Sequence, residues 1–154
     1  AGKDMALTQY QNGADVGFNV AGSAGLGQIE AAAQSQKYAF GVDSDQAALL
    51  PEYADYIPTS ALKNVGNSLI RAIKADMEEE LEFDQTEYLG FAEGGVELLE
   101  DDHYSEVVPE NIRTKIEELK QQITDGEIEV PTALGDNAMS NDEIQELIDS
   151  VKVK

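Results

Sequence analysis

The stretch GADVGFNVAGSAGLGQIEAAAQSQKYAFGVDSDQ, residues 13–46, decides the fold of this chain. Residues 14–20 form a short, mostly apolar run that favours a buried strand. A glycine-rich turn follows, then an alanine-rich segment that favours a helix, and then a second apolar run that ends at Asp43. Strand, turn, helix and strand in this order predict a βαβ unit with parallel strands and a right-handed crossover.

The same stretch also predicts where a ligand would bind, because α/β sheets bind ligands outside the carboxyl ends of their strands. Residues 21–27 and 43–46 fall at those ends. Gly22, Gly25 and Gly27 do not follow the spacing of dinucleotide-binding proteins. They can form a tight strand-to-helix turn, or they can offer backbone amides at a helix N-terminus to a polar ligand.

Four side chains near these strand ends are candidates for ligand contacts or for structural roles. Asp43 and Asp45 can accept hydrogen bonds from neighbouring sugar hydroxyls, or they can cap a helix or form a turn. The residues after Asp45 do not supply the oxygen ligands of a calcium loop. Lys63, expected at the start of a helix, can contact a ligand or be an ordinary surface cation. Phe18, in the first strand, can contact a ligand or be an ordinary core aromatic.

The rest of the chain alternates helical and extended patterns. We expect helices at residues 3–12, 61–77, 109–126 and 140–151, strands at residues 54–60, 88–91, 96–99 and 127–130, and a polar loop at residues 100–106 with His103 exposed. This order predicts an α/β fold with a mainly parallel sheet flanked by helices. We also expect nearly complete burial of the apolar strand side chains Val16, Val20, Phe40 and Val42.

Composition limits the possible functions. A chain of 154 residues suits one domain with its own core, and it has no run of 18 apolar residues. It has no cysteine and one histidine, and we find no catalytic triad or phosphate-binding loop, so we expect no catalytic residue, no metal and no cofactor. The net charge of −21 would repel nucleic acid, which we therefore exclude as a partner.

Several motifs occur in one order along the chain. They are FNVAGSAGLG at residues 18–27, YAFGVDSDQ at 38–46, TSALKNV at 59–65, LGFAEGGV at 89–96 and VPENIRTKIEELKQQITDGEIEVP at 108–131. In this combination the chain resembles the basic membrane protein family of substrate-binding lipoproteins of ABC transporters, which includes purine nucleoside receptors of bacteria. The resemblance covers residues 3–131, and residues 132–154, a loop and an amphipathic helix, fall outside it.

The resemblance implies a type I periplasmic-binding fold, in which two lobes close on a nucleoside, and a transporter permease as partner. It implies that Asp43 binds the ribose hydroxyls, that Lys63 is a second contact to the sugar, and that Phe18 lies near the base. Gly22 and Gly25 would let the backbone approach the ligand. The full-length lipoprotein would be extracytoplasmic and membrane-associated, whereas we expect this chain itself to be soluble.

Family members are about twice as long, so we expect this chain to correspond to the second half of such a protein. It would then be a fragment, a processed product or a truncated gene product, and the first lobe or another copy of the chain would complete the site. Three functions remain open at this point. The chain can bind nucleosides without catalysis, it can act through protein contacts alone, or it can be an α/β enzyme.

Overall fold

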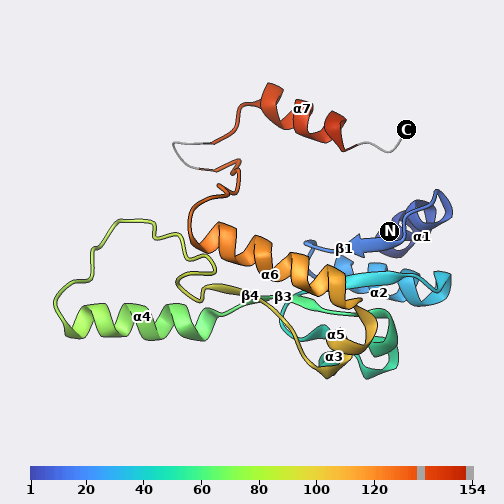
Figure 1. Cartoon of the computed structure of the whole chain (residues 1–154), viewed down its shortest axis with the longest axis horizontal. Helices are drawn as coiled ribbons and strands as arrows, with labels where there is room; N and C mark the ends of the chain where they lie inside the picture. Colours follow the sequence, from blue (N-terminus) through green and yellow to red (C-terminus); the bar gives the residue numbers. More distant parts are fainter. Residues whose placement is uncertain (135–137, 152–154) are drawn as a thin grey trace. The chain divides into compact units, whose positions relative to one another are not determined.

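The computed structural model describes residues 1–134 and 138–151 of the chain (Figure 1). It contains two compact units, residues 1–117 and residues 118–154. The first unit holds the sheet and the predicted site, and the second holds the end of one helix and the C-terminal helix. The expected division at residue 131 stays a prediction.

A four-stranded sheet organises the first unit. Its spatial order follows the sequence: β1 (Val16–Phe18), β2 (Tyr38–Asp43), β3 (Ser60–Lys63) and β4 (Val96–Leu98). β1 pairs with β2 and β2 with β3 in parallel, whereas β4 pairs with β3 antiparallel. The prediction of an α/β fold with a mainly parallel sheet is therefore confirmed, and the βαβ unit has the predicted order.

The core lies between this sheet and two helices, α1 (Gly2–Gln11) and α2 (Ala24–Ser35), which pack against each other. Its buried side chains are Ala6, Tyr10, Ile29, Ala31, Ala32, Ala39 and Ile57. The Tyr10 hydroxyl donates to the Tyr38 carbonyl at 2.8 Å and so ties α1 to β2. Burial raises the pKa of the Tyr10 phenol above its ordinary value, which keeps this hydroxyl a donor.

The predicted burial of the large strand side chains is wrong. Val16 is 44% and Val20 is 73% exposed, and Phe40 and Val42 are half-buried. The buried face of the sheet belongs to the small residues that alternate with them, because α1 and α2 approach there. Gly17 and Ala39 are paired on that face, and a Cβ on Gly17 would lie 2.6 Å from the Tyr10 hydroxyl. A mostly apolar run does not indicate which of its two faces is buried.

Around β3 the boundaries differ from the prediction. The segment expected to be a strand at residues 54–60 begins as a 3₁₀ helix, η1 (Pro51–Tyr56), which follows the short helix α3 (Gln46–Leu49). The strand begins only at Ser60, and the helix expected from residue 61 is α4 (Val65–Met77). Residues 60–63 satisfy their backbone groups by pairing with β2 and β4, and this tertiary pairing overrides their helical pattern.

The later segments mix confirmed and wrong predictions. Of the two strands expected at residues 88–91 and 96–99, the structure has the second as β4, and it has no strand at 127–130. The expected polar loop is helix α5 (Asp102–Val107), because the Asp101 carboxylate caps the Tyr104 amide at 2.8 Å. His103 lies on this helix half-buried, so its predicted exposure is also wrong.

Two predicted helices of the C-terminal part are present. They are α6 (Glu110–Thr124) and α7 (Asn141–Ser150). α6 follows Pro109, and it ends before Gly126, which has a positive φ of 72°. α7 begins with the predicted capping box, in which Ser140 and Glu143 satisfy each other's backbone amides.

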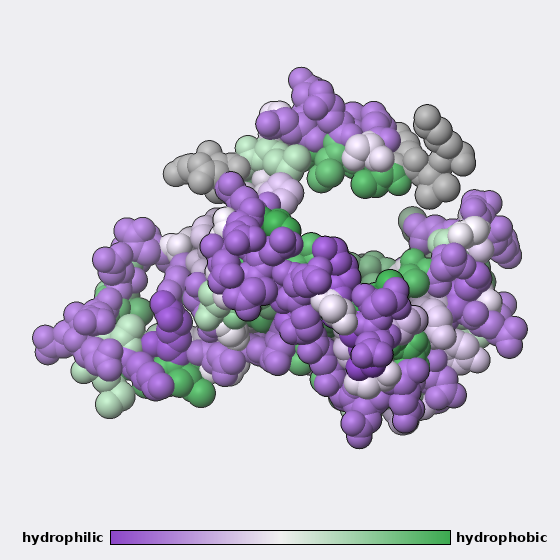
Figure 2. Space-filling view, in the orientation of Figure 1, coloured by the Kyte–Doolittle hydropathy of each residue, from purple (hydrophilic) through white to green (hydrophobic). Residues whose placement is uncertain are grey.

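α4 differs from the core helices because its apolar side is uncovered. All of its residues lie in the described part of the chain, and none of them is buried. Its large exposed side chains are Val65, Leu69, Ile70, Ile73 and Met77. Figure 1 shows α4 extending away from the sheet, and Figure 2 shows hydrophobic surface along its lower edge. Across the described residues, no helix combines the length and apolar character that a membrane span needs.

Candidate functional site

The carboxyl ends of the three parallel strands meet at one edge of the sheet, and the candidate side chains stand there. β1 ends at Phe18, β2 at Asp43 and β3 at Lys63. Asp43 is in register with Leu62, so the end of β2 lies beside the end of β3. Lys63, predicted to begin a helix, is instead the last residue of a strand.

Asp43 and Lys63 contact each other directly. The Lys63 Nζ lies 2.9 Å from Asp43 Oδ1, and both side chains are more than half exposed, at 61% and 56%. An ion pair this exposed contributes about 0–1 kcal/mol to stability. Its carboxylate keeps lone pairs for further donors, and its ammonium keeps further protons. The pair therefore offers an acceptor and a donor side by side, and it contributes little to the stability of the fold.

The backbone at Asp43 ends the strand abruptly. Asp43 has a φ of 68°, in the left-handed region that non-glycine residues seldom adopt, although Asp and Asn adopt it more readily than most. The Ser44 amide then donates to the Val42 carbonyl at 2.8 Å, which closes a tight turn around Asp43. Because the chain turns here and does not continue as a strand, the Asp43 carboxylate stays exposed.

The neighbouring carboxylate has a different task. Asp45 Oδ1 accepts from the Ala48 amide at 3.0 Å, and Asp45 is the N-cap of α3. Of the two roles that the sequence left open, the structure gives helix capping to Asp45. Asp43 has no such local side-chain bond among the described residues, and its carboxylate pairs with Lys63.

Phe18 presents an aromatic ring at the same edge. Its side chain is 55% exposed, so it is not the core aromatic that the sequence also allowed. The ring packs edge-to-face on Phe40, with the ring centroids 6.4 Å apart and the planes at 63°. Phe40 thus supports one side of Phe18 and leaves the remainder open to a planar partner.

The two glycines of the turn after β1 differ. Gly22 has a φ of 54°, and no atom of the described residues lies within 4 Å of where its Cβ would be. Gly25, in the first turn of α2, is buried, and a Cβ there would lie 2.2 Å from Asn19 Oδ1. Gly22 is open to the approach of another molecule, whereas Gly25 is closed by Asn19.

Asn19 is the residue of this edge that the sequence analysis missed. It is 3% exposed, and its Nδ2 donates to the Phe40 carbonyl at 3.0 Å. A polar residue between two large apolar ones, Phe18 and Val20, was the available signal. This signal is weak by itself, because a mostly apolar strand often carries a polar residue at its end.

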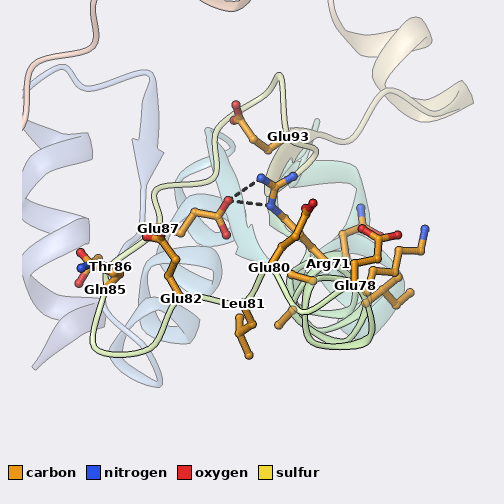
Figure 3. Close-up of a pocket in the computed structure, with 14 residues that line it drawn as sticks. Arg71, Glu78, Glu80, Leu81, Glu82, Gln85, Thr86, Glu87 and Glu93 are labelled. Carbon is orange, nitrogen blue, oxygen red and sulfur yellow. Dashed lines mark hydrogen bonds and ion pairs between the residues drawn. The ribbon is translucent and has the colours of Figure 1, made fainter.

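An open groove elsewhere in the first unit holds none of the predicted site residues. It lies between α4 and the segment 78–93 (Figure 3), and it is rich in glutamates. Arg71 crosses it to Glu87, with Nε 2.7 Å from Oε1, and this hydrogen bond and charge raise the pKa of the Arg71 guanidinium. In the described part of the chain no group of carboxylates or histidines is arranged to hold a metal ion.

Parallel strands that present exposed polar and aromatic side chains at their carboxyl edge are typical of α/β ligand-binding proteins. The sequence model of the Bmp family, described as PnrA-like ABC transporter substrate-binding protein, matches residues 1–133. The chain belongs to this family. The family is one of substrate-binding proteins and not of enzymes, which agrees with the predicted absence of catalysis.

Two relatives illustrate the similarity. Basic membrane protein D of Borreliella burgdorferi (strain JD1) is 32% identical over 137 residues, which are 84% of this chain and 38% of the relative. Basic membrane protein A1 of Borrelia garinii subsp. bavariensis is 34% identical over 134 residues, 85% of this chain and 38% of that protein. The chain thus spans about two fifths of the length of these relatives.

Solved structures agree on the fold. An ABC transporter solute-binding protein from Aeropyrum pernix K1 superposes with a TM-score of 0.70 at 24% identity, over 97% of this chain and 47% of the other. A protein from Bacillus halodurans, described as a transcriptional activator of the comK gene, has a TM-score of 0.68 at 26% identity, over 82% of this chain and 44% of the other. The type I binding-protein architecture expected from the sequence is consistent with these neighbours.

Proposed function

We propose that this chain contributes one wall of a nucleoside-binding site in a substrate-binding protein of an ABC transporter. The observation that carries the proposal is the exposed Asp43–Lys63 pair at the carboxyl edge of the sheet. A carboxylate accepts hydrogen bonds from two neighbouring hydroxyls at once, as the 2′ and 3′ hydroxyls of ribose present them. Lys63, held beside it, donates to a further sugar oxygen.

The other side chains of this edge suit the rest of a nucleoside. The half-open ring of Phe18 can stack on a purine base, supported from behind by Phe40. The uncrowded backbone at Gly22 can approach the ligand closely, and Gly25 keeps the turn compact. Binding then requires no catalytic group, no metal and no cofactor, and the proposed cargo is a purine nucleoside.

The setting of the site follows from the family. We propose that the longer protein is an extracytoplasmic lipoprotein that delivers its ligand to a transporter permease. A first lobe or another copy of this chain would supply the opposite wall. The high negative charge argues against nucleic acid as a partner.

The test is calorimetric titration of the 154-residue chain with inosine and guanosine. Asp43→Asn removes the charge while keeping shape, and Asn tolerates the left-handed backbone at this position. Because a hydrogen bond to a charged group contributes roughly 1.5–3 kcal/mol, we expect affinity to fall about ten- to a hundredfold. Asp45→Asn is the matched control, since Asn caps helices as well as Asp does and should leave binding unchanged.

The results that would contradict the proposal are distinct. If Asp43→Asn binds as tightly as the parent while Asp45→Asn loses affinity, then Asp45 and not Asp43 contacts the sugar. No effect of either change would remove the support for nucleoside binding itself.

A second function is favoured by one observation, the uncovered apolar side of α4. Under this alternative the chain is a truncated fragment that acts through protein contacts alone. It predicts no thermal shift with any nucleoside, together with self-association that rises with protein concentration in sedimentation equilibrium. The nucleoside proposal predicts a thermal shift with at least one purine nucleoside.

A further inference from the structure

Asn19 has a burial opposite to that of its neighbours. Its side chain is 3% exposed, whereas Phe18 before it is 55% and Val20 after it is 73% exposed. Ordinary strands bury the apolar residues and expose the amide. A buried amide in this position must be held by specific partners, since an unsatisfied polar group in the interior is unfavourable.

One partner is the neighbouring strand. Asn19 Nδ2 donates to the Phe40 carbonyl at 3.0 Å. Phe40 is the residue of β2 that pairs with Phe18 in the last pair of the β1–β2 ladder. β1 stops at Phe18 while β2 continues to Asp43, so the side chain of Asn19 extends the bonding of the two strands past the end of the shorter one. Reversing the amide would turn its oxygen toward the carbonyl, and this fixes its orientation.

The other side of the amide faces α2. A Cβ on Gly25 would lie 2.2 Å from Asn19 Oδ1 and 2.7 Å from its Cγ, distances at which one of the two groups has to move. Glycine is therefore required at position 25 by Asn19 itself. Among the described residues Oδ1 has no hydrogen-bond partner, so Asn19 makes this contact at an energetic cost.

We propose that Asn19 is a positioning residue of the candidate site, and this inference rests on the proposed function. Through Phe40 it fixes the support of the Phe18 ring, and through Gly25 it fixes the start of α2 and the turn that holds Gly22. Asn19 is too buried to touch a ligand. It sets the distance between the aromatic part of the edge and the Asp43 part.

The test uses three variants of the full chain: Asn19→Ala, Gly25→Ala, and both together. Urea unfolding followed by circular dichroism gives stability, and inosine titration gives affinity. Each single variant should lower the urea midpoint. In the double variant the nearest remaining side-chain atom is the Cβ of position 19, 3.2 Å from the new one, so its midpoint should exceed that of Gly25→Ala.

Affinity should behave differently from stability. The hydrogen bond to the Phe40 carbonyl is absent in both variants that lack Asn19, so both should bind inosine about tenfold more weakly than the parent. Recovery of stability without recovery of affinity separates positioning from a purely structural role. Asn111→Ala removes an exposed asparagine from α6 and should lower neither the urea midpoint nor the affinity.

Two results would overturn the inference. One is an affinity that follows stability through all three variants, and the other is a double variant no more stable than Gly25→Ala. If the parent chain takes up no inosine, the proposed function fails for this chain, and amide hydrogen exchange decides the inference. Asn19→Ala should then speed exchange at residues 18–25 more than in α1, whereas a uniform increase would contradict positioning.

Discussion

Two helices of the same unit, α2 and α4, each follow a parallel strand of the sheet, yet one is buried and the other is bare. α2 places Ile29, Ala31 and Ala32 in the core, with no exposed surface. α4 has the more regular apolar stripe, but Ile73 is 59% and Leu69 is 60% exposed. Periodicity shows that a helix has an apolar side, whereas the neighbouring elements decide whether that side is covered.

The difference in burial between α2 and α4 depends on how closely neighbouring elements pack against each helix. A Cβ on Gly27 of α2 would lie 2.6 Å from the Lys3 amide nitrogen, so α1 and α2 are in backbone contact there. α4 is held by polar bonds, such as Asn67 Nδ2 to the Gly94 carbonyl at 3.0 Å and the Arg71–Glu87 pair. Exposed bonds of this kind contribute about 0–1 kcal/mol each.

The largest expected effect comes from matched truncations in the two helices. Ile29→Ala should lower the free energy of unfolding by about 2–5 kcal/mol, because it leaves a cavity among buried side chains. Ile73→Ala, the same change on α4, should stay within about 0.5 kcal/mol. Urea denaturation of both variants measures the contrast. Equal losses would mean that the stripe of α4 is covered in solution.

A smaller effect concerns charge, which also divides the chain. Residues 1–75 carry 7 acidic and 5 basic residues, whereas residues 76–154 carry 24 acidic and 5 basic ones. Self-repulsion in the acidic part is screened over about 10 Å at 0.1 M salt. The urea midpoint should therefore rise between low salt and 0.5 M sodium chloride, by less than the loss in Ile29→Ala. Identical midpoints would contradict this expectation.

The smallest effect is expected in α7, which like α4 has no buried side chain in its described residues. Hydrogen bonds from the Ser140 amide and hydroxyl lower the pKa of the Glu143 carboxyl. A lowered pKa stabilises the helix above the unfolded-state pKa, and this support is lost as the pH falls through the folded-state value. NMR amide exchange at residues 140–143, taken relative to the intrinsic exchange rate at each pH, should therefore show less protection at acidic pH.

Glu143→Gln provides the control for this pH effect. Glutamine keeps the capping geometry and does not titrate, so the protection of these amides in this variant should lack the acid-induced loss. A loss of protection equal to that of the parent would show that another group is responsible.

The end of a strand at Asp43 could be predicted from the sequence, because strand order and strand ends follow from the βαβ pattern. Asp43 and Lys63 meet although 20 positions separate them in the sequence, since their strands are parallel neighbours. The start of α4 was misplaced because residues 61–63 fit a helix and a strand equally well, and only pairing with β2 and β4 decides. The role of Asn19 could not be predicted, because it depends on where Phe40 and Gly25 come to lie.

The antiparallel pairing of β3 with β4 has a consequence for the order of folding. Val16 finds its partner Tyr38 22 positions further along the chain, whereas Ala61 pairs with Leu98, 37 positions away. Closing the longer loop costs more chain entropy, and the intervening α4 buries nothing that would offset it. We therefore expect β1, α2 and β2 to assemble early and β4 to join the sheet late. During synthesis, all of residues 64–98 would have to leave the ribosome before the last strand could reach its place.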